Sequence, residues 1–264
     1  MEFKIRSKYL KEFIDEITYK NRNPDQLKAL ELLDDIDTNP EIILYPGDVI
    51  YRSRVIKQKS KINNEPNFFG FGCKDSFIAP AENTREFRAN YRYIPYLYCA
   101  KHPYTAVLEV RPRLGATVSV ATIQVKEKLR ILDFTLQEIS KKMSPAKINL
   151  FTDLSNMYAK PVTDEDDISD YIPTQFIAEY AKRHLNYDGI AYKSSLMPEL
   201  DSLKSPLNQK DDRYNVVIFN HEKCVPIKSN IVQVTNHYLD CEQTDDDKKH
   251  LNLKSIITET LESL

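Results

Sequence analysis

Hydrophobic residues recur at helical spacing near the start of the chain. Residues 7–20 (SKYLKEFIDEITYK) place Tyr9, Leu10, Phe13, Ile14 and Ile17 on one helix face, and a second pattern begins at Pro24 and includes Leu27, Leu30, Leu33 and Ile36. Residues 1–40 are therefore predicted to form a helical extension. A structural support packed on the main body explains this extension better than a binding role does.

After Pro46 the pattern changes to short runs of β-branched and aromatic residues, which favour strands. Strands are predicted at 48–56, 93–100, 117–125, 188–195 and 215–220. A helix is predicted over 170–185, where Pro173 suits the first turn and an apolar stripe follows. Helices and strands alternate at no steady period, so an α+β fold is favoured over a doubly wound parallel sheet.

One acidic residue, Glu109, interrupts an apolar run in residues 96–112 (YLYCAKHPYTAVLEVRP). Pro103 and Pro112 bound a short predicted helix with Glu109 in its last turn, and the β-branched residues there keep a strand as the alternative. A carboxylate among apolar neighbours either reaches water from the edge of an element or lies in a cleft that needs a negative charge.

Two polar segments are predicted to lie at the periphery, and a tail follows the main domain. The acidic run 164–167 and the segment 197–213 have the composition of surface loops, the second as an excursion or lid between two strands. Residues 237–264 are predicted to be a C-terminal tail with an amphipathic helix. This helix either docks back on the protein or contacts a partner or a second subunit, so a homo-oligomer stays open.

The charge of the chain argues against nucleic acid or a membrane surface as a partner. The 264 residues include 37 basic and 39 acidic ones, which are interspersed and give a net charge of −2. The sequence contains no run of 18 apolar residues, and its N-terminus has no uninterrupted apolar segment. A cytoplasmic location is the default expectation.

The cysteines predict neither a disulfide framework nor a metal site. Cys73, Cys99, Cys224 and Cys241 are far apart and form no CxxC pair, so reduced and mostly buried thiols are expected. His221 and Cys224 form an HxxC pair, but nothing nearby completes the three or four ligands that a metal needs.

Common nucleotide and hydrolase motifs are absent from the sequence. Gly70 and Gly72 in FFGFGC do not make a dinucleotide fingerprint, because the third glycine is missing and no helical pattern follows. There is no GxxxxGK[ST], HExxH or GxSxG motif.

Polar residues that interrupt the strand-like runs form an ordered series that resembles a known family. The segments are YRSR, FGC, RAN, IPYLYCA, TAVLEVRP, VSVA, ILDF, YIPTQFIAEYAK, YDGIAYKSS and NVVIFN. In this order they resemble the RES domain over roughly residues 44–235. One such match means little, whereas ten in the correct order are a specific signal. We place the expected RES domain at 41–236.

The resemblance implies a fold similar to that of ADP-ribosyltransferases, with a split, mostly antiparallel sheet and surrounding helices. It also implies an NAD-degrading toxin that is paired with a Xre-type antitoxin or another inhibitory protein. NAD is then the substrate and no cofactor is needed. The products are nicotinamide and ADP-ribose, or phosphorylated ADP-ribose when phosphate is the co-substrate.

The family's functional residues carry over to eight positions of this chain. Those implied to be catalytic are Glu109, Arg52, Arg88 and Ser194, and those implied to bind NAD are Tyr51, Tyr98, Asn90 and Tyr192. The residue types suit the chemistry. A carboxylate stabilises the positive charge that develops on the ribose, guanidinium groups match pyrophosphate oxygens, and an aromatic face attracts the nicotinamide ring.

One departure from the family pattern leaves other functions open. Phe87 occupies the position before Arg88 where the family usually has glycine, so the backbone there is expected to approach a ligand differently. The alternatives are transfer of ADP-ribose to a protein acceptor, and a non-catalytic nucleotide sensor.

Overall fold

A computed structural model describes residues 4–57, 65–137, 142–160, 168–196 and 213–236. Its strands form one sheet in the order β1-β5-β6-β7-β3-β2-β4-β8. They are β1 Glu41–Leu44, β2 Val49–Val55, β3 Leu97–Ala100, β4 Thr117–Val125, β5 Leu129–Asp133, β6 Gly189–Lys193, β7 Tyr214–Ile218 and β8 Cys224–Gln233. Among the strands described, β5 and β6 pair in parallel and the other neighbours are antiparallel. The expected α+β class with a mostly antiparallel sheet is confirmed.

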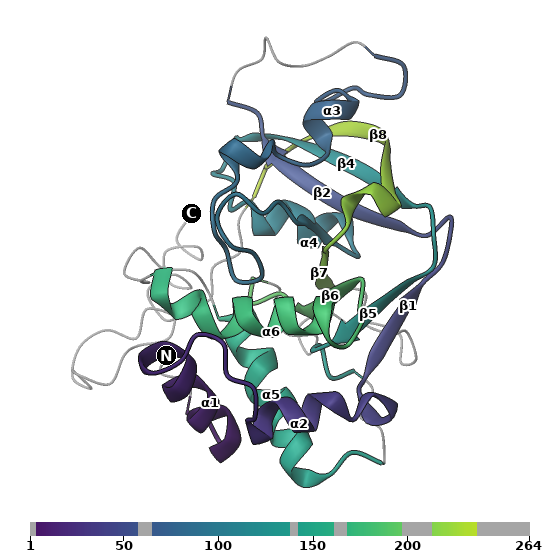
Figure 1. Cartoon of the computed structure of the whole chain (residues 1–264). Helices are drawn as coiled ribbons and strands as arrows, with labels where there is room; N and C mark the ends of the chain where they lie inside the picture. Colours follow the sequence, from purple (N-terminus) through teal and green to yellow (C-terminus); the bar gives the residue numbers. More distant parts are fainter. Residues whose placement is uncertain (1–3, 58–64, 138–141, 161–167, 197–212, 237–264) are drawn as a thin grey trace, which may run out of the picture.

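The sheet is split between β3 and β2. These strands pair only at Tyr51 and Ala100, whereas β2 pairs with β4 along its whole length. One part of the sheet is therefore β1-β5-β6-β7-β3 and the other is β2-β4-β8. Figure 1 shows the second part at the top of the molecule, with α4 (Pro103–Glu109) lying below β2. Because α4 contacts β2, β3 and β7, it lies where the two parts diverge.

Four helices gather beside the first part of the sheet in the described residues (Figure 1). They are α1 Lys8–Tyr19, α2 Lys28–Asp34, α5 Pro145–Ala159 and α6 Ile172–Arg183. The short helix α3 (Cys73–Ser76) packs on β8. Short 3-10 turns occupy Ile36–Thr38, Ala81–Asn83, Ile168–Tyr171 and His221–Lys223. None of the helices in the described ranges is long and apolar enough to cross a membrane.

The start of α1 is tied to α5 by hydrogen bonds. The Ser7 hydroxyl accepts from the Leu10 amide at 3.2 Å and caps the helix. The buried carboxylate of Asp153 accepts from the amides of Arg6 and Ser7 at 2.8 and 2.6 Å. Leu10 and other apolar residues of α1 join the main hydrophobic core. The N-terminal helical extension is therefore confirmed and is continuous with the core.

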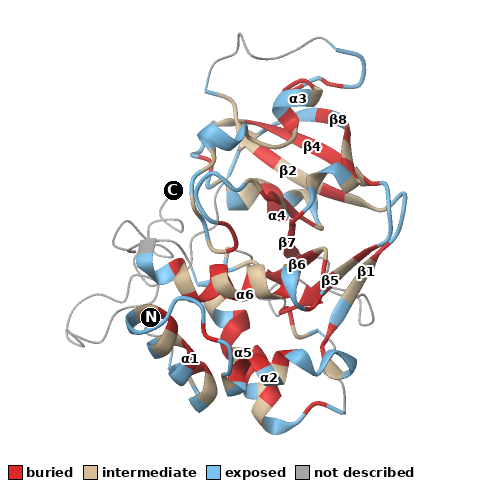
Figure 2. Ribbon diagram, in the orientation of Figure 1, coloured by how far each residue is buried: buried red, intermediate tan, exposed pale blue. Residues whose placement is uncertain are grey.

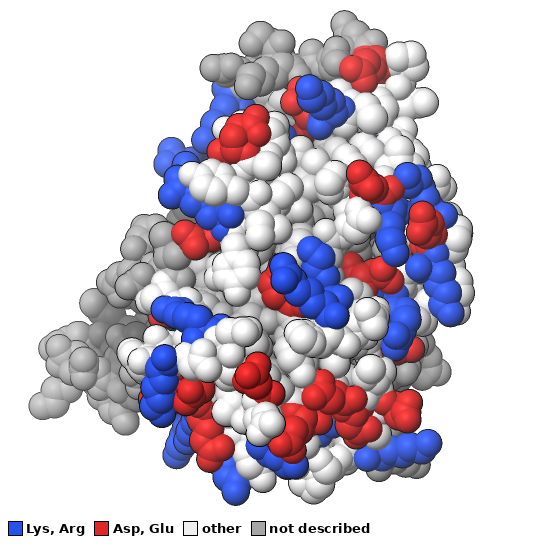
Figure 3. Space-filling view, viewed as in Figure 1, with Lys and Arg blue, Asp and Glu red and all other residues white. Residues whose placement is uncertain are grey.

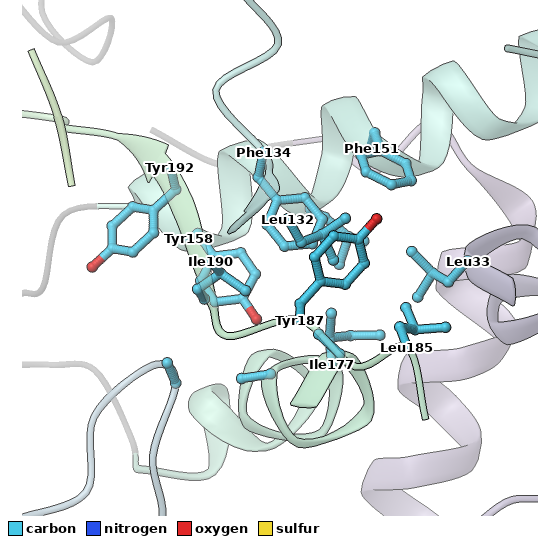
Figure 4. Packing of buried hydrophobic residues seen from close by; sticks show 14 of the residues in the cluster. Leu33, Leu132, Phe134, Phe151, Tyr158, Ile177, Leu185, Tyr187, Ile190 and Tyr192 are labelled. Carbon is cyan, nitrogen blue, oxygen red and sulfur yellow. The ribbon is translucent and has the colours of Figure 1, made fainter. Parts of the chain in front are cut away.

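Burial is concentrated on α5 and on the central strands (Figure 2). The core contains a stack of aromatic rings: Phe134 lies 5.1 Å from Tyr158, and Tyr158 lies 5.5 Å from Tyr192. Figure 4 shows Tyr192 at the edge of this group, with its hydroxyl pointing away from Phe134 and Phe151. The stack thus leads from the helical core to the split in the sheet.

Most of the predicted elements are confirmed. The helices expected at 7–20 and 170–185 form, and the segment after Pro103 is helical rather than a strand. The strands expected at 48–56, 117–125, 188–195 and 215–220 form as β2, β4, β6 and β7. The predicted strand 93–100 was too long, since β3 begins at Leu97 and Tyr93 has a left-handed φ of 69°. The second helix begins at Lys28 instead of Pro24.

Some expectations fall outside the described residues. They concern the acidic run 164–167, nearly all of the 197–213 segment, and the tail helix in 237–264. The boundaries 1–40, 41–236 and 237–264 stay predictions.

The surface seen in Figure 3 carries lysine and arginine side chains interspersed with aspartate and glutamate. No single sign of charge dominates this face. This mixture agrees with the even balance of the sequence, in which basic and acidic residues are almost equal in number.

Candidate active site

A cavity of about 500 Å³ lies at the split in the sheet. Strands β2, β3, β6 and β7, the end of α4, the end of α5 and Phe87–Arg88 all line it. Its volume is in the range of small-molecule sites. Among the described residues that line it, the charged ones are Arg52, Arg88, Arg111, Lys160, Lys193 and the single acid Glu109.

Glu109 is the last residue of α4 and projects at the cavity. The helix ends there because Arg111, directly before Pro112, adopts a left-handed φ of 44°. The Glu109 Oε1 atom accepts two hydrogen bonds, from the Ser194 hydroxyl at 2.6 Å and from Asn215 Nδ2 at 2.7 Å. Glu109 is exposed. Glu109 therefore lies at the edge of an element and also faces a cleft. Both of the alternatives that its sequence context left open apply to it.

Arg52 is a half-buried cation of β2 whose Nη1 has no hydrogen-bond partner among the described residues. Burial lowers the pKa of Arg52 to about 10, and the positive charge of Arg54 acts in the same direction. The group is thus still protonated at neutral pH. A buried guanidinium nitrogen without a partner is costly, and the side chain of Arg52 also lines the cavity.

Arg88 lines the cavity, but its side chain is already engaged. Its Nη1 donates to the Met157 carbonyl at 2.7 Å and its Nη2 donates to the Lys160 carbonyl. The guanidinium also lies over the Tyr171 ring, 5.4 Å from its centroid. Both carbonyls belong to the end of α5, so Arg88 ties its own loop to that helix.

Tyr98 and Asn90 form a hydrogen-bonded pair beneath this loop. The Tyr98 hydroxyl donates to Asn90 Oδ1 at 2.8 Å and accepts from the Ala89 amide at 3.1 Å. Asn90 is fully buried, and its Nδ2 donates to two backbone carbonyls. Tyr98 lines the cavity, whereas Asn90 lies behind it. The Gln175 side chain of α6 donates to the carbonyls of Phe87 and Asn90 at 2.9 and 3.1 Å.

Three more predicted residues lie at the cavity. Tyr51 and Tyr192 line it, and Ser194 reaches it through its hydrogen bond to Glu109. Burial raises the pKa of Tyr192, and the negative charge of Glu109 adds to the effect. The fold thus brings six of the eight predicted residues to the lining of one cavity, with Ser194 bonded to one of them and Asn90 directly behind it.

The sequence did not single out Asn215 as a site residue. It lies on β7, which is buried along its length, and its amide contacts Glu109. A polar side chain within the apolar run NVVIFN was the available signal. Phe87 was noted only as a departure. It lines the cavity, is 50% exposed, and packs edge-on against Tyr98 at 5.8 Å.

The ranges that the structure describes contain no cluster of three or more histidine, cysteine, aspartate or glutamate residues suited to a metal. His221 of the HxxC pair packs against the Phe77 ring at 5.5 Å. Cys73, Cys99 and Cys224 are free thiols, and the latter two are buried. Cys241 lies outside the described residues.

Fold and cavity together define an α+β protein with a cation-lined pocket at the split of a mostly antiparallel sheet. Residues 67–239 match the RES domain, and the chain belongs to the RES domain family. The match begins after β2, so Tyr51 and Arg52 precede it.

A search of curated proteins found no match. Among solved structures, the chain is similar to one in the crystal structure of the M. tuberculosis MbcT–MbcA toxin–antitoxin complex. The TM-score is 0.41 with 13% identity, and the alignment covers 79% of this chain and 93% of that chain.

Proposed function

We propose that this RES protein degrades NAD by cleaving the bond between nicotinamide and ribose. The observation that carries the proposal is the lining of the cavity, where one carboxylate, Glu109, faces a group of cations. A dinucleotide needs this combination, because its pyrophosphate is anionic while its reacting end becomes more positive during cleavage.

Glu109 acts on the reacting end. As the C–N bond breaks, its electron pair leaves with the nicotinamide nitrogen, and positive charge develops on the anomeric carbon of the ribose. The ionised carboxylate stabilises this charge electrostatically. A water or phosphate oxygen then forms the new C–O bond, and water loses its proton to solvent. The product is ADP-ribose, or its phosphorylated form with phosphate.

Arg52 is the better supported partner of the pyrophosphate. Its Nη1 has no partner within the described chain, whereas both terminal nitrogens of Arg88 donate to carbonyls. Arg88 still contributes positive charge to the cavity, and it fixes the loop that carries Phe87. We therefore propose that Arg52 binds phosphate oxygens directly and that Arg88 acts mainly by holding this wall.

Aromatic side chains supply the surface for the nicotinamide ring. Tyr51, Tyr98, Tyr192 and Phe87 all line the cavity. A cationic ring over such a face gains roughly 0.5–2 kcal/mol. Phe87 stands where the family usually has glycine, so it adds a wall that a glycine does not provide.

An enzyme that depletes NAD harms the cell that contains it, so we propose that the protein is a toxin. A Xre-type antitoxin or another inhibitory protein would restrain it. Co-expression with the neighbouring reading frame tests this: the toxin proposal expects growth arrest with the protein alone and growth when the inhibitor is present.

The direct test is release of nicotinamide by the purified protein. NAD is supplied with and without phosphate, and the products are separated by chromatography and identified by mass spectrometry. Glu109→Gln is expected to lower turnover by about 100-fold or more, as expected for loss of one preorganised charge. Glu12→Gln, on the exposed face of α1, is the matched control and should match the wild type. No release by the wild type would refute the proposal, and an added protein whose mass rises by one ADP-ribose would indicate transfer to an acceptor.

A further inference from the structure

The side chain of Asn215 is placed where an apolar residue is expected. β7 is buried at every position, and Asn215 is 5% exposed. Its backbone is held on both sides, since Asn215 pairs with Ala100 of β3 and with Tyr192 of β6. A buried amide in such a strand is costly unless its polar atoms find partners.

The partner of this amide is the Glu109 carboxylate. Asn215 Nδ2 donates to Glu109 Oε1 at 2.7 Å, and the Ser194 hydroxyl donates to the same atom at 2.6 Å. Both hydrogen bonds that the described residues make to the Glu109 side chain thus fall on Oε1. The lone pairs of Oε2 stay available for a ligand in the cavity.

Glu109 needs outside support because of its position. It is the exposed final residue of a short helix, and the C-terminal end of a helix disfavours a negative charge. A long exposed side chain also has several rotamers. Of the two donors, Ser194 follows the end of β6, whereas Asn215 lies within a strand that is paired on both sides.

We infer that Asn215 is a positioning residue, which fixes the orientation of the Glu109 carboxylate. This inference rests on the proposed NAD cleavage. In that reaction the free oxygen must face the anomeric carbon, and an error in its placement weakens charge stabilisation in the transition state more than it weakens substrate binding.

The test compares Asn215→Ala and Asn215→Asp with the wild type in nicotinamide release. Asn215→Ala is expected to lower kcat by about 10-fold or more and to change KM by less than about threefold. Asn215→Asp keeps the shape but puts a second carboxylate beside Glu109. Two adjacent carboxylates share a proton, so the acid limb of the kcat/KM profile should move about one pH unit or more upward.

Asn220→Asp is the matched control, because it makes the same chemical change at an exposed residue outside the cavity. Its pH profile should be that of the wild type. Urea unfolding separates a positioning role from a purely structural one. The shifts in urea midpoint of Asn215→Ala and Glu109→Ala should not add in the double variant, since each single change breaks the same contact.

Each result has a distinct meaning. A wild type that releases no nicotinamide overturns the proposed function, and the inference with it. If the wild type is active, and if the pH profile of Asn215→Asp and the turnover of Asn215→Ala both equal those of the wild type, only the inference about Asn215 is overturned. A loss of activity that follows unfolding, with additive urea midpoints, also overturns it and leaves Asn215 a structural residue.

Discussion

Replacing Tyr98 with phenylalanine removes one hydroxyl and keeps the ring that lines the cavity. This hydroxyl donates to Asn90 Oδ1 at 2.8 Å and accepts from the Ala89 amide at 3.1 Å. Both partners belong to residues with no exposed surface. Each is left buried without its partner, at a cost of about 1–2 kcal/mol, so the variant should lose roughly 2–4 kcal/mol of unfolding free energy.

Urea unfolding followed by circular dichroism measures this loss, and thermal unfolding should show a fall in Tm of roughly 5–15 °C. Tyr45→Phe is the control, because Tyr45 is 58% exposed, and it should change stability by less than about 0.5 kcal/mol. If Tyr98→Phe is as stable as this control, the hydroxyl does not anchor the loop. If it is unstable yet binds NAD with an unchanged KM, the ring rather than the hydroxyl serves the ligand.

Three other substitutions test separate parts of the structure. Arg52→Lys should weaken ADP binding about 10-fold in calorimetry, because an ammonium group does not reproduce the two-pronged contact of a guanidinium; unchanged affinity would argue against a phosphate contact. Gln175→Leu removes the donor to the carbonyls on either side of Arg88 and should cost about 1–3 kcal/mol in urea unfolding; a neutral result would mean that the loop is held without it. Asp153→Ala removes the acceptor for two amides at the start of α1, including that of Ser7, and should cost a similar amount; equal urea midpoints would contradict this role.

The sequence predicted the elements with a clear hydrophobic period and missed those without one. Strand β8 is an edge strand and contains Pro226, which an edge tolerates because no neighbour needs its missing amide hydrogen. Helix α5 buries polar residues, among them Lys147, Asp153 and Ser155, in addition to apolar ones. A helix buried on several sides does not show one apolar stripe, and its pattern alone does not predict its packing.

The residues of the candidate site were predicted one at a time from the sequence, whereas their arrangement in space could be seen only in the folded structure. Ser194 and Glu109 are 85 positions apart, and the packing of α4 against β3 and β7 is needed to bring them together. Asn215 was visible as a polar residue in an apolar run, but sequence does not say which neighbour a strand residue faces. For Arg88, the residue type suggested phosphate, whereas two carbonyls at the end of α5 lie within reach of its side chain.

The net charge of the chain bears on the binding of charged polymers but not on the binding of small ligands. The chain carries −2 overall, and on the face in Figure 3 a nucleic acid that spans many phosphates meets no continuous basic surface. Screening at physiological salt limits charge effects to about 8 Å. A ligand with two phosphates inside the cavity therefore responds to its lining, where cations outnumber the single acid. In the proposed NAD cleavage, this lining has two roles: the cations hold the anionic end of the dinucleotide, and Glu109 faces the end that becomes positive.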